Sequence, residues 1–403
     1  MGIVMRSTQD GPPTIRARDL GIALDGAPGP LNAITDVPGV EVGMVTIIRD
    51  TETATARTGV TAILPRGKSG VGVPCAAATY SLNGNGEMTG RAWIDESGSL
   101  ALPIAITNSH SVGAVHRGVD EWLARVSREV AAQWMLPVVA ETWDGYLNEI
   151  NGQHVSSADA GAALDAASPG AVAEGNVGGG TGMNCYGFKG GSGTASRVVP
   201  IGGAEYTLGV FTQANFGSRK ELRVGGVSLG KQSAAPCPIE QDQNWLAADG
   251  GGRAVGGAGS VIVVVATDAP LLPGQCAALA RRVPLGLARS GTTGSHFSGD
   301  IFLAFSTANP GALSSRMEGP GEASPLEHLA FLPWGAIDPL YEAVVEAVEE
   351  SVLNVLVAAE DMVGRAGHAS YRLPHEEIVA AFGSASPAGE GEPRAGVPAS
   401  PAS

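Results

Sequence analysis

The feature of this chain that most constrains its fold is a pair of short segments that are apolar at both odd and even positions. They read "SVIVVVAT", residues 260–267, and "IFLAFST", residues 301–307. A strand of this kind needs cover on both faces of its sheet. Two further short apolar strands are expected, "GVTAILP" and "PIAIT". We therefore predict an α/β protein in which two packed sheets lie between two layers of helices, a four-layer αββα sandwich.

The helices expected in the outer layers are indicated by the spacing of apolar residues. The clearest helix is predicted from about Val112 to Trp134, where apolar residues recur at steps of three and four and form one buried face. The residues of this face are Val115, Val119, Trp122, Val126 and Val130.

Residues typical of a first helical turn indicate two more helices. In "TDAPLLPGQCAALARR", Asp268 is expected to cap the helix and Pro270 to lie in the first turn. The other begins near Asp338 and Pro339, and its apolar stripe contains Val344, Val348, Val352 and Val355. Residues 1 to about 30 are expected to form a loosely held arm. The segment 384–403 is rich in Pro, Ala, Gly and Ser and predicts a disordered tail.

Charge and cysteine content exclude several classes of protein. The net charge of −15 is spread along the chain, which argues against binding to nucleic acid or to an anionic membrane. The four cysteines form no C-x-x-C pair and suit small buried side chains in a reducing compartment. No apolar stretch is long enough for a membrane span and the N-terminus lacks a leader pattern, so we expect a cytoplasmic protein.

Cofactor and metal sites are not indicated. The chain has 58 glycines, but its glycine-rich segments, such as "EGNVGGGTGMNCYGFKGGSGTASR", contain no phosphate-binding G-x-x-x-x-G-K-[ST] motif. The seven histidines never take the H-E-x-x-H spacing of a zinc site, and His110 in "TNSHSVG" suits ordinary turn chemistry. We expect neither a cofactor nor a metal.

Ser260 stands between a glycine-rich loop and an apolar strand. A serine needs a base to take its proton, and no G-x-S-x-G elbow surrounds this one. If the bond between Gly259 and Ser260 were cut, Ser260 would gain an α-amine with a pKa of roughly 7.7–8.0, a competent base beside its own hydroxyl. From the residues alone this N-terminal nucleophile is plausible, while an ordinary turn before a strand remains an alternative.

The stretch "GSVIVVVATDAPLLPGQ" resembles the cleavage site of the DmpA-type L-aminopeptidase/D-esterase and β-aminopeptidase family, whose members are made as one chain and cut before a serine. The resemblance covers residues 18 to about 380 and rests on seven separated blocks in order. The other six are "AITDVPGVEVG", "LPIAITNSHSVG", "PVVAETWDGYLNEIN", "EGNVGGGTGMNCYGFKGGSGTASR", "FTQANFG" and "HFSGDIFLAFSTAN".

That resemblance implies a fold similar to N-terminal-nucleophile hydrolases with its own strand connectivity. It implies self-cleavage into an α subunit, residues 1–259, and a β subunit, residues 260–403, within one structural domain. The αβ protomers are expected to form a homotetramer. The expected substrates are short peptides, amides or esters with a free N-terminal amine.

The matching blocks also imply roles for individual residues. Ser260 stands at the nucleophile position, and Ser298 with Asp300 stand where the family has a serine and an acidic residue that orient the nucleophile. Glutamate is common at the position of Asp300, so the shorter aspartate is a departure. Asn215 and Tyr146 match positions that steady the oxyanion or the leaving group. For the substrate ammonium we expect Glu141, with Asp144 as a second candidate, although both could instead hydrate or cap a turn.

Two other functions stay open at this point. One is a non-catalytic protein that binds a small ligand with its glycine-rich loops as anion sites. The other is an acyl transferase similar to the ornithine acetyltransferases, which also cleave themselves, but before a threonine. A serine at position 260 favours hydrolysis.

Overall fold

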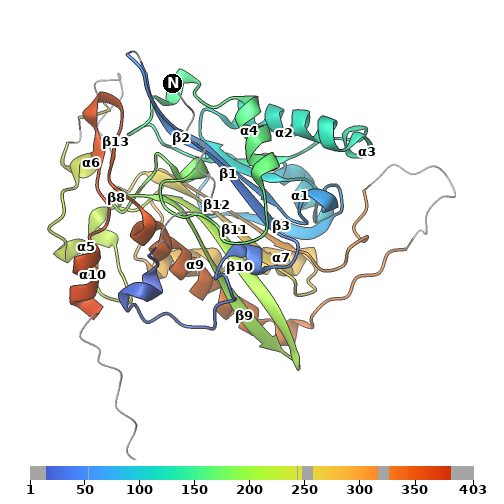
Figure 1. Ribbon diagram of the computed structural model, residues 1–403. Coiled ribbons are helices and arrows are strands. Elements are labelled where there is room, and N and C mark those ends of the chain that lie inside the picture. The colour runs from blue at the N-terminus through green and yellow to red at the C-terminus, as the bar shows by residue number, and fades with distance from the viewer. Residues whose placement is uncertain (1–14, 53, 243, 247–256, 316–325, 383–403) are drawn as a thin grey trace, which may run out of the picture.

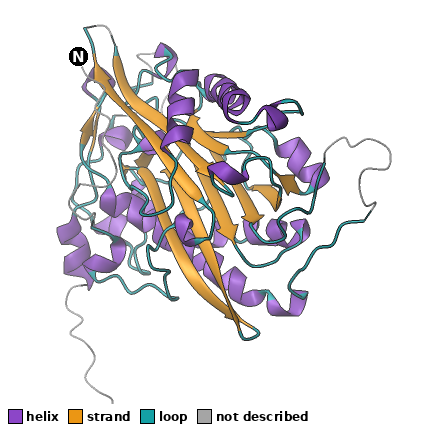
Figure 2. Cartoon of the chain, turned by 45° about the vertical axis from the view of Figure 1, so that its right-hand side comes forward, coloured by secondary structure: helices purple, strands orange, loops and turns teal. Residues whose placement is uncertain are grey.

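Two β-sheets packed face to face form the centre of the computed structural model, which describes residues 15–52, 54–242, 244–246, 257–315 and 326–382 (Figures 1 and 2). One sheet has four strands in the order β1-β2-β5-β6, and the other has six in the order β4-β3-β12-β11-β10-β9. The strands of the first sheet are β1 Glu41–Asp50, β2 Thr55–Leu64, β5 Ile104–Asn108 and β6 Val138–Thr142. Those of the second are β3 Cys75–Ser81, β4 Ser99–Leu100, β9 Gly191–Ile201, β10 Ala204–Asn215, β11 Gly259–Thr267 and β12 Ser298–Ser306.

Helices cover the outer faces of both sheets (Figure 1). On the four-stranded sheet lie α2 Val112–Val126 and α4 Ser157–Ala166, and on the six-stranded sheet lie α7 Pro273–Ala280 and α9 Asp338–Ala358 with α8 Val283–Arg289 packed on α9. The shorter helices are α1 Arg91–Ser97, α3 Arg128–Ala131, α5 Leu229–Gln232, α6 Pro238–Gln241 and α10 His375–Phe382. Two small hairpins are β7 Asn184–Cys185 with β8 Phe188–Lys189, and β13 Met362–Val363 with β14 Ala369–Ser370. The predicted four-layer αββα arrangement is confirmed.

Strand β11 lies between β10 and β12 and is buried on both faces, as its sequence predicts. Val261, Val263 and Val265 pack toward the helical layer, in the cluster that contains Val348 of α9. Ile262 and Val264 pack toward the other sheet, in a cluster that also contains Ile301 of β12. Alternate side chains of this strand thus belong to two different cores.

The strand order interleaves the two parts of the chain that flank residue 260. Strands β11 and β12 come from the later part, while β3 on one side and β10 on the other come from the earlier part. The middle of the larger sheet therefore belongs to residues 260–403 and both of its margins belong to residues before 260.

Two local predictions are corrected and a third is confirmed. The helix expected to reach Trp134 breaks at Ser127, whose side-chain oxygen accepts a hydrogen bond from Val130 N at 3.3 Å and starts α3, so Val126 is 45% exposed. The helix expected from Asp268 begins at Pro273 instead, because the Asp268 carboxylate accepts a hydrogen bond from Thr207 N at 2.7 Å. The third predicted helix, α9, begins at Asp338 with its valine stripe buried, as expected.

The arm expected to be loose is firmly held over residues 15–30. Arg16 and Arg18 form ion pairs with Glu174 and Glu350, each at 2.8 Å, and Ala17 between them is fully buried. These partners lie more than 150 residues away in the chain, and no local sequence pattern indicates them. Residues 1–14 and the tail from 383 lie outside the described residues.

Candidate active site

Ser260 is the second residue of β11 and is 2% exposed. In the sheet its Cα is paired with Asn215 at the end of β10 and with Gly299 near the start of β12. Because side chains alternate along a strand, Ser260 shares the face of Ile262 and Val264 and points toward the four-stranded sheet. Its hydroxyl therefore lies between the two sheets, at the point where β11 begins.

A backbone amide of the opposite sheet holds that hydroxyl. Trp143 directly follows β6, which packs against β11, and its N–H donates to Ser260 Oγ at 3.0 Å. An oxygen that accepts here keeps its own proton available for transfer to a base. The contact fixes the position of Oγ without consuming the hydrogen that catalysis has to remove.

Asn215 lies beside Ser260 on the same face of the sheet. Its Oδ1 accepts a hydrogen bond from Asn184 N at 2.9 Å, in the β7–β8 hairpin. That bond orients the amide, so that Nδ2, the donor end, is turned away from Asn184. A donor next to the nucleophile is what the expected oxyanion role requires.

Ser298 and Asp300 lie on the other face of the same strands. Their Cα atoms pair with Gly259 and Val261, which flank Ser260, so they share the helix-facing side of the sheet. Ser298 Oγ donates to Asp300 Oδ1 at 2.5 Å. Burial raises the pKa of Asp300, against the lowering effect of this bond. The pair thus neighbours the backbone of residues 259 and 260 rather than the Ser260 hydroxyl.

Glu141 lies near the end of β6 and is 5% exposed. Its two carboxylate oxygens accept hydrogen bonds from Glu87 N, at 2.9 Å, and from the Ser109 hydroxyl. Burial raises the pKa of Glu141, and the hydrogen bonds from Ser109 and Glu87 oppose that shift. The two hydrogen-bond donors to this nearly buried carboxylate are neutral, which leaves it suited to receive a cation.

Asp144 is fully buried, and its Oδ1 accepts a hydrogen bond from Asn148 Nδ2 at 3.0 Å. Burial raises the pKa of Asp144 to about 7. Asn148 in turn accepts from Arg57 N in β2, at 3.0 Å. These contacts anchor the turn after β6, and the greater exposure of Glu141 makes it the better candidate for the substrate amine.

The Tyr146 hydroxyl is turned toward the β13–β14 hairpin, where it donates to Ala369 O over a long 3.4 Å. Its ring stacks on His368, with centroids 4.7 Å apart, and meets Trp245 edge-on. Burial raises the pKa of Tyr146 to about 12. In this arrangement the Tyr146 ring is packed against its aromatic neighbours, and its hydroxyl donates only one long, weak hydrogen bond.

Gly259 has a steric reason to be glycine. A Cβ added there would lie 1.9 Å from the carbonyl oxygen of Asn215, a backbone atom that cannot move aside cheaply. The close approach between β11 and β10 therefore requires a residue without a side chain directly before Ser260. The preceding residues 251–256 lie outside the described part of the chain.

Sequence reasoning missed two partners of the site. The first is the Trp143 amide, which no sequence pattern distinguishes from other backbone groups. The second is Asn83, whose Nδ2 donates to Asp300 Oδ2 at 2.9 Å and to Ser295 O at 3.0 Å. Its only signal was a turn-like "NGNG" run after a strand.

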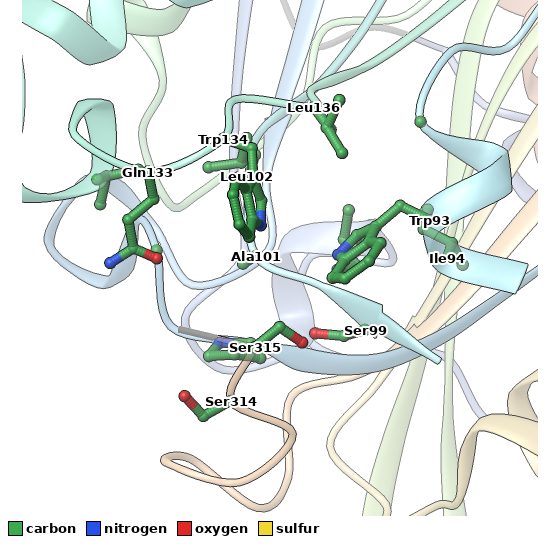
Figure 3. A pocket seen from close by; sticks show the side chains of 15 residues that line it. Trp93, Ile94, Ser99, Ala101, Leu102, Gln133, Trp134, Leu136, Ser314 and Ser315 are labelled. Carbon is green, nitrogen blue, oxygen red and sulfur yellow. The ribbon is translucent and has the colours of Figure 1, made fainter. Parts of the chain in front are cut away.

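A separate hollow is lined by other residues than those of the candidate site (Figure 3). Trp93, Trp134 and Leu136 line it, together with Ser314 and Ser315. The described residues that line it include no ionisable side chain, so this hollow offers no acid or base.

The described residues contain neither a candidate metal site nor a candidate membrane span. No cluster of three or more His, Cys, Asp or Glu side chains there could hold a metal ion. None of the helices in the described ranges has the length and hydropathy to cross a membrane. All four cysteines are buried and free, as their sequence context suggested.

Comparison with known proteins places these residues in a family context. Residues 32–370 match the family model described as peptidase family S58. The chain is 48% identical to the β-peptidyl aminopeptidase BapA of Sphingosinicella microcystinivorans, over 92% of each chain. It is 43% identical to the BapA of Sphingosinicella xenopeptidilytica, over 90% of each.

Solved structures agree in fold. The L-aminopeptidase D-Ala-esterase/amidase from Ochrobactrum anthropi superposes with a TM-score of 0.82 at 43% identity, covering 91% of this chain and 99% of that one. That protein is described as a prototype for the serine aminopeptidases and a new variant among the N-terminal-nucleophile hydrolase fold. A Burkholderia β-aminopeptidase gives a TM-score of 0.81 at 44% identity, covering 92% of this chain and 99% of that one.

Proposed function

Because the chain belongs to peptidase family S58, we propose that it is a serine aminopeptidase that creates its own N-terminal nucleophile at Ser260. Its substrates are short peptides, amides or esters that carry a free N-terminal amine. The observation that carries this proposal is the place of Ser260 at the start of a central strand, with Oγ held by the Trp143 amide. The hydroxyl and a donor amide lie on one face of this strand end, and the buried Ser298–Asp300 pair lies on the other.

Self-cleavage is the first reaction. Ser260 Oγ attacks the Gly259 carbonyl, the bond from that carbon to Ser260 N breaks, and an ester forms in its place while N takes up the proton that Oγ loses. Water then hydrolyses the ester. The products are an α subunit, residues 1–259, that ends in a carboxylate and a β subunit, residues 260–403, that begins with a free amine.

Turnover reuses the same oxygen. The Ser260 amine takes the proton from Oγ as Oγ attacks the substrate carbonyl, and then gives it to the departing group. Asn215 Nδ2 stabilises the negative oxygen of the tetrahedral intermediate, and Tyr146 is the second candidate donor. Water activated by the same amine releases the acyl group.

The remaining site residues orient the Ser260 amine or bind the substrate. Ser298 and Asp300 neighbour the backbone of residues 259 and 260, and in the cleaved protein they hold the ammonium form of the Ser260 amine and orient it. Glu141 binds the substrate ammonium. Asp144 braces the turn that presents the Trp143 amide.

The two alternative functions lose ground to this proposal. An anion-binding protein and an acyl transferase are both compatible with glycine-rich loops, but the matched family and its aminopeptidase-named relatives are peptidases. The αβ protomers are proposed to form a homotetramer in the cytoplasm. The family resemblance supports the homotetramer, and the four buried free cysteines, which suit a reducing compartment, support the cytoplasm.

Mass spectrometry of freshly purified protein tests the proposal. Two fragments with masses of residues 1–259 and 260–403, together with release of p-nitroaniline from an amino-acid p-nitroanilide, are the expected result. An intact chain that still hydrolyses the anilide would show that the Ser260 amine is not the base. An intact and inactive chain would favour the ligand-binding alternative.

A further inference from the structure

Lys189, the last residue of β8, is a fully buried lysine that the proposed mechanism does not use. Its Nζ donates to two backbone oxygens, Met183 O and Gly190 O, both at 2.8 Å. Burial lowers the pKa of Lys189 to about 7, because an ammonium is costly to remove from water. Lysine is almost never fully buried unless its charge is well served, so its two acceptors indicate what it does.

The first acceptor, Met183 O, belongs to the peptide group that holds Asn215. The carbonyl of Met183 and the N–H of Asn184 are the two ends of one peptide bond. The oxygen accepts from Lys189 Nζ, and the N–H donates to Asn215 Oδ1 at 2.9 Å. A single planar peptide thus lies between the buried ammonium and the side-chain amide that neighbours Ser260.

Hydrogen bonds in such a chain strengthen one another. A cation at the carbonyl oxygen draws electron density from the peptide and makes its N–H a stronger donor. A stronger bond to Asn215 Oδ1 polarises the side-chain amide in the same sense, so that Nδ2 also becomes a stronger donor. Nδ2 is the atom assigned above to the oxyanion of the tetrahedral intermediate. The chain of bonds therefore carries the effect of the Lys189 charge to the place where negative charge develops.

The same lysine fixes where the open end of the β7–β8 hairpin lies. Lys189 is paired with Asn184 across the hairpin, and its Nζ joins the residues just outside that pair. The second acceptor, Gly190, packs tightly on β10, since a Cβ there would be 2.5 Å from Ala214 O and 2.9 Å from Asn184 C. Ala214 directly precedes Asn215. A displacement of this end of the hairpin would therefore move the Asn215 amide.

The turn of the hairpin is held by a different cation. Arg219 donates to Tyr186 O at 3.1 Å and to Gly187 O at 2.7 Å. Its guanidinium lies 3.3 Å from the centroid of the Phe188 ring. Tyr186 and Gly187 have the positive φ angles, 53° and 67°, of a two-residue type I′ turn. Because the turn has these contacts of its own, a change at Lys189 should affect mainly the open end.

We propose that Lys189 is a positioning residue of the oxyanion site. Through the Met183–Asn184 peptide it orients the Asn215 amide and strengthens it as a donor. This inference rests on the proposed function, because it takes Asn215 as the oxyanion donor and Ser260 as the nucleophile. The oxyanion exists only after attack on the carbonyl, so Lys189 should contribute to the transition state and not to substrate binding.

Lys189→Met tests the inference, because it removes the ammonium and keeps an unbranched side chain of similar length. Loss of a complete oxyanion donor costs about 100-fold to 1,000-fold in kcat, and Lys189 acts only through such a donor. We therefore expect kcat for L-alanine p-nitroanilide to fall about tenfold, with KM within twofold of wild type. Complete cleavage before Ser260, read by mass spectrometry, shows that the variant has folded.

Two inhibitors separate the oxyanion site from the rest of the pocket. In 1-aminoethylboronic acid the boron accepts Ser260 Oγ as a fourth ligand and becomes a tetrahedral anion, while the Oγ proton passes to the Ser260 amine. L-Alaninol carries the same amine and side chain but forms no such anion. The boronic acid should bind Lys189→Met about tenfold more weakly, matching the fall in kcat/KM, and alaninol should bind within twofold of wild type.

Arg219→Met is the matched control, since it removes the buried cation at the turn of the same hairpin. Its kcat and its affinity for the boronic acid should stay within threefold of wild type. An equal fall of kcat in Arg219→Met and Lys189→Met would show that any loosening of the hairpin has the same effect, and the inference would be wrong.

Other outcomes also overturn the inference. Unchanged affinity of Lys189→Met for the boronic acid, or an equal loss of both inhibitors, would remove Lys189 from the oxyanion site. If Lys189→Met is not cut, Lys189→Gln takes its place, because its side chain keeps a neutral donor for Met183 O. We expect a loss of about threefold there, confined to kcat and the boronic acid, and no loss would contradict the proposal. Failure of the proposed function looks different, because wild-type protein would then hydrolyse no anilide.

Discussion

The two faces of the sheet at Ser260 carry different chemistry. The face toward the other sheet holds the Ser260 hydroxyl, which accepts from the Trp143 amide, and the Asn215 side chain, both neutral. The face toward the helices holds the Ser298–Asp300 pair, in which burial raises the pKa of the carboxyl. One strand thus separates the group that attacks from the groups that orient its amine.

This difference teaches how a single residue can serve as both nucleophile and base. The side chain of a strand residue projects to one face, whereas its backbone nitrogen lies in the sheet, within reach of either face. Cleavage at this position turns the nitrogen into an amine that neighbours the helix-facing pair while the hydroxyl stays on the other side. Substitutions on the two faces should therefore have separable effects.

Removing the Ser260 hydroxyl should abolish both self-cleavage and substrate turnover. Ser260→Ala is expected to give an uncut chain with at least a thousandfold loss of activity, because the same oxygen performs cleavage and turnover. Ser260→Cys keeps a nucleophile and should be cut slowly. Mass spectrometry and an anilide assay measure the two effects. If Ser260→Ala were cut at the same bond, another protease would make the cut and self-processing would be disproved.

Changing the helix-facing carboxyl should affect the amine and leave the hydroxyl in place. Asp300→Asn removes a negative charge that favours the charged form of the Ser260 amine, so the pKa of that amine should fall. We expect about a hundredfold loss of kcat and a shift of the rising limb of the pH–rate profile to lower pH. A pH–rate series on cleaved protein checks this.

Asn83→Ala is the control for that experiment. It removes one hydrogen bond from Asp300 and keeps the charge. The loss should be about tenfold and the profile should keep its midpoint. A profile that shifts equally in both variants would show that geometry, rather than the charge of Asp300, controls the amine.

Changing the amine site should affect only one class of substrate. Glu141→Gln is expected to lower kcat/KM for a free amino-acid amide about 10-fold to 100-fold, since a charge-assisted bond is worth about 1.5–3 kcal/mol. Its N-acetyl form should be a poor substrate of both proteins. Equal turnover of the free and acetylated forms by the wild-type protein would eliminate the amine pocket.

Chelation of metal ions should have the smallest effect, because the proposed base is an amine and no step of the proposed mechanism uses a metal. Dialysis against EDTA is expected to leave the rate unchanged. Loss of activity that zinc or manganese restores would reveal a metal site that the ligand spacing in the sequence does not predict.

The layered fold could be predicted because it depends on burial, which sequence records directly. Two strands that carry apolar residues at both odd and even positions require cover on both faces, and β11 and β12 have it. The family resemblance then indicated which serine to consider. Whether Ser298, Asp300, Asn215, Tyr146 and Glu141 perform their assigned roles stays a prediction.

What the sequence did not predict depends on contacts between distant residues. Asp268 suited a helix cap, but Thr207 N in another strand takes its carboxylate. The sequence around Arg16 and Arg18 is typical of a loose arm. Their partners, Glu174 and Glu350, lie far away in the chain. Asn83 is separated from Asp300 by more than 200 residues. Such pairs depend on tertiary packing, and local propensity carries no information about them.

The interleaved strand order of the larger sheet should make the protein difficult to refold once it has been cut before Ser260. Once the chain is severed before Ser260, β11 and β12 of one fragment remain hydrogen-bonded on both sides to β3 and β10 of the other. Separating the fragments would require opening the middle of a sheet. Folding, which is unimolecular for the precursor, becomes bimolecular for the severed fragments, so recovery after denaturation should depend on protein concentration. The bond that the protein breaks to become active is thus the one that lets it assemble alone, and each molecule has to fold before it matures.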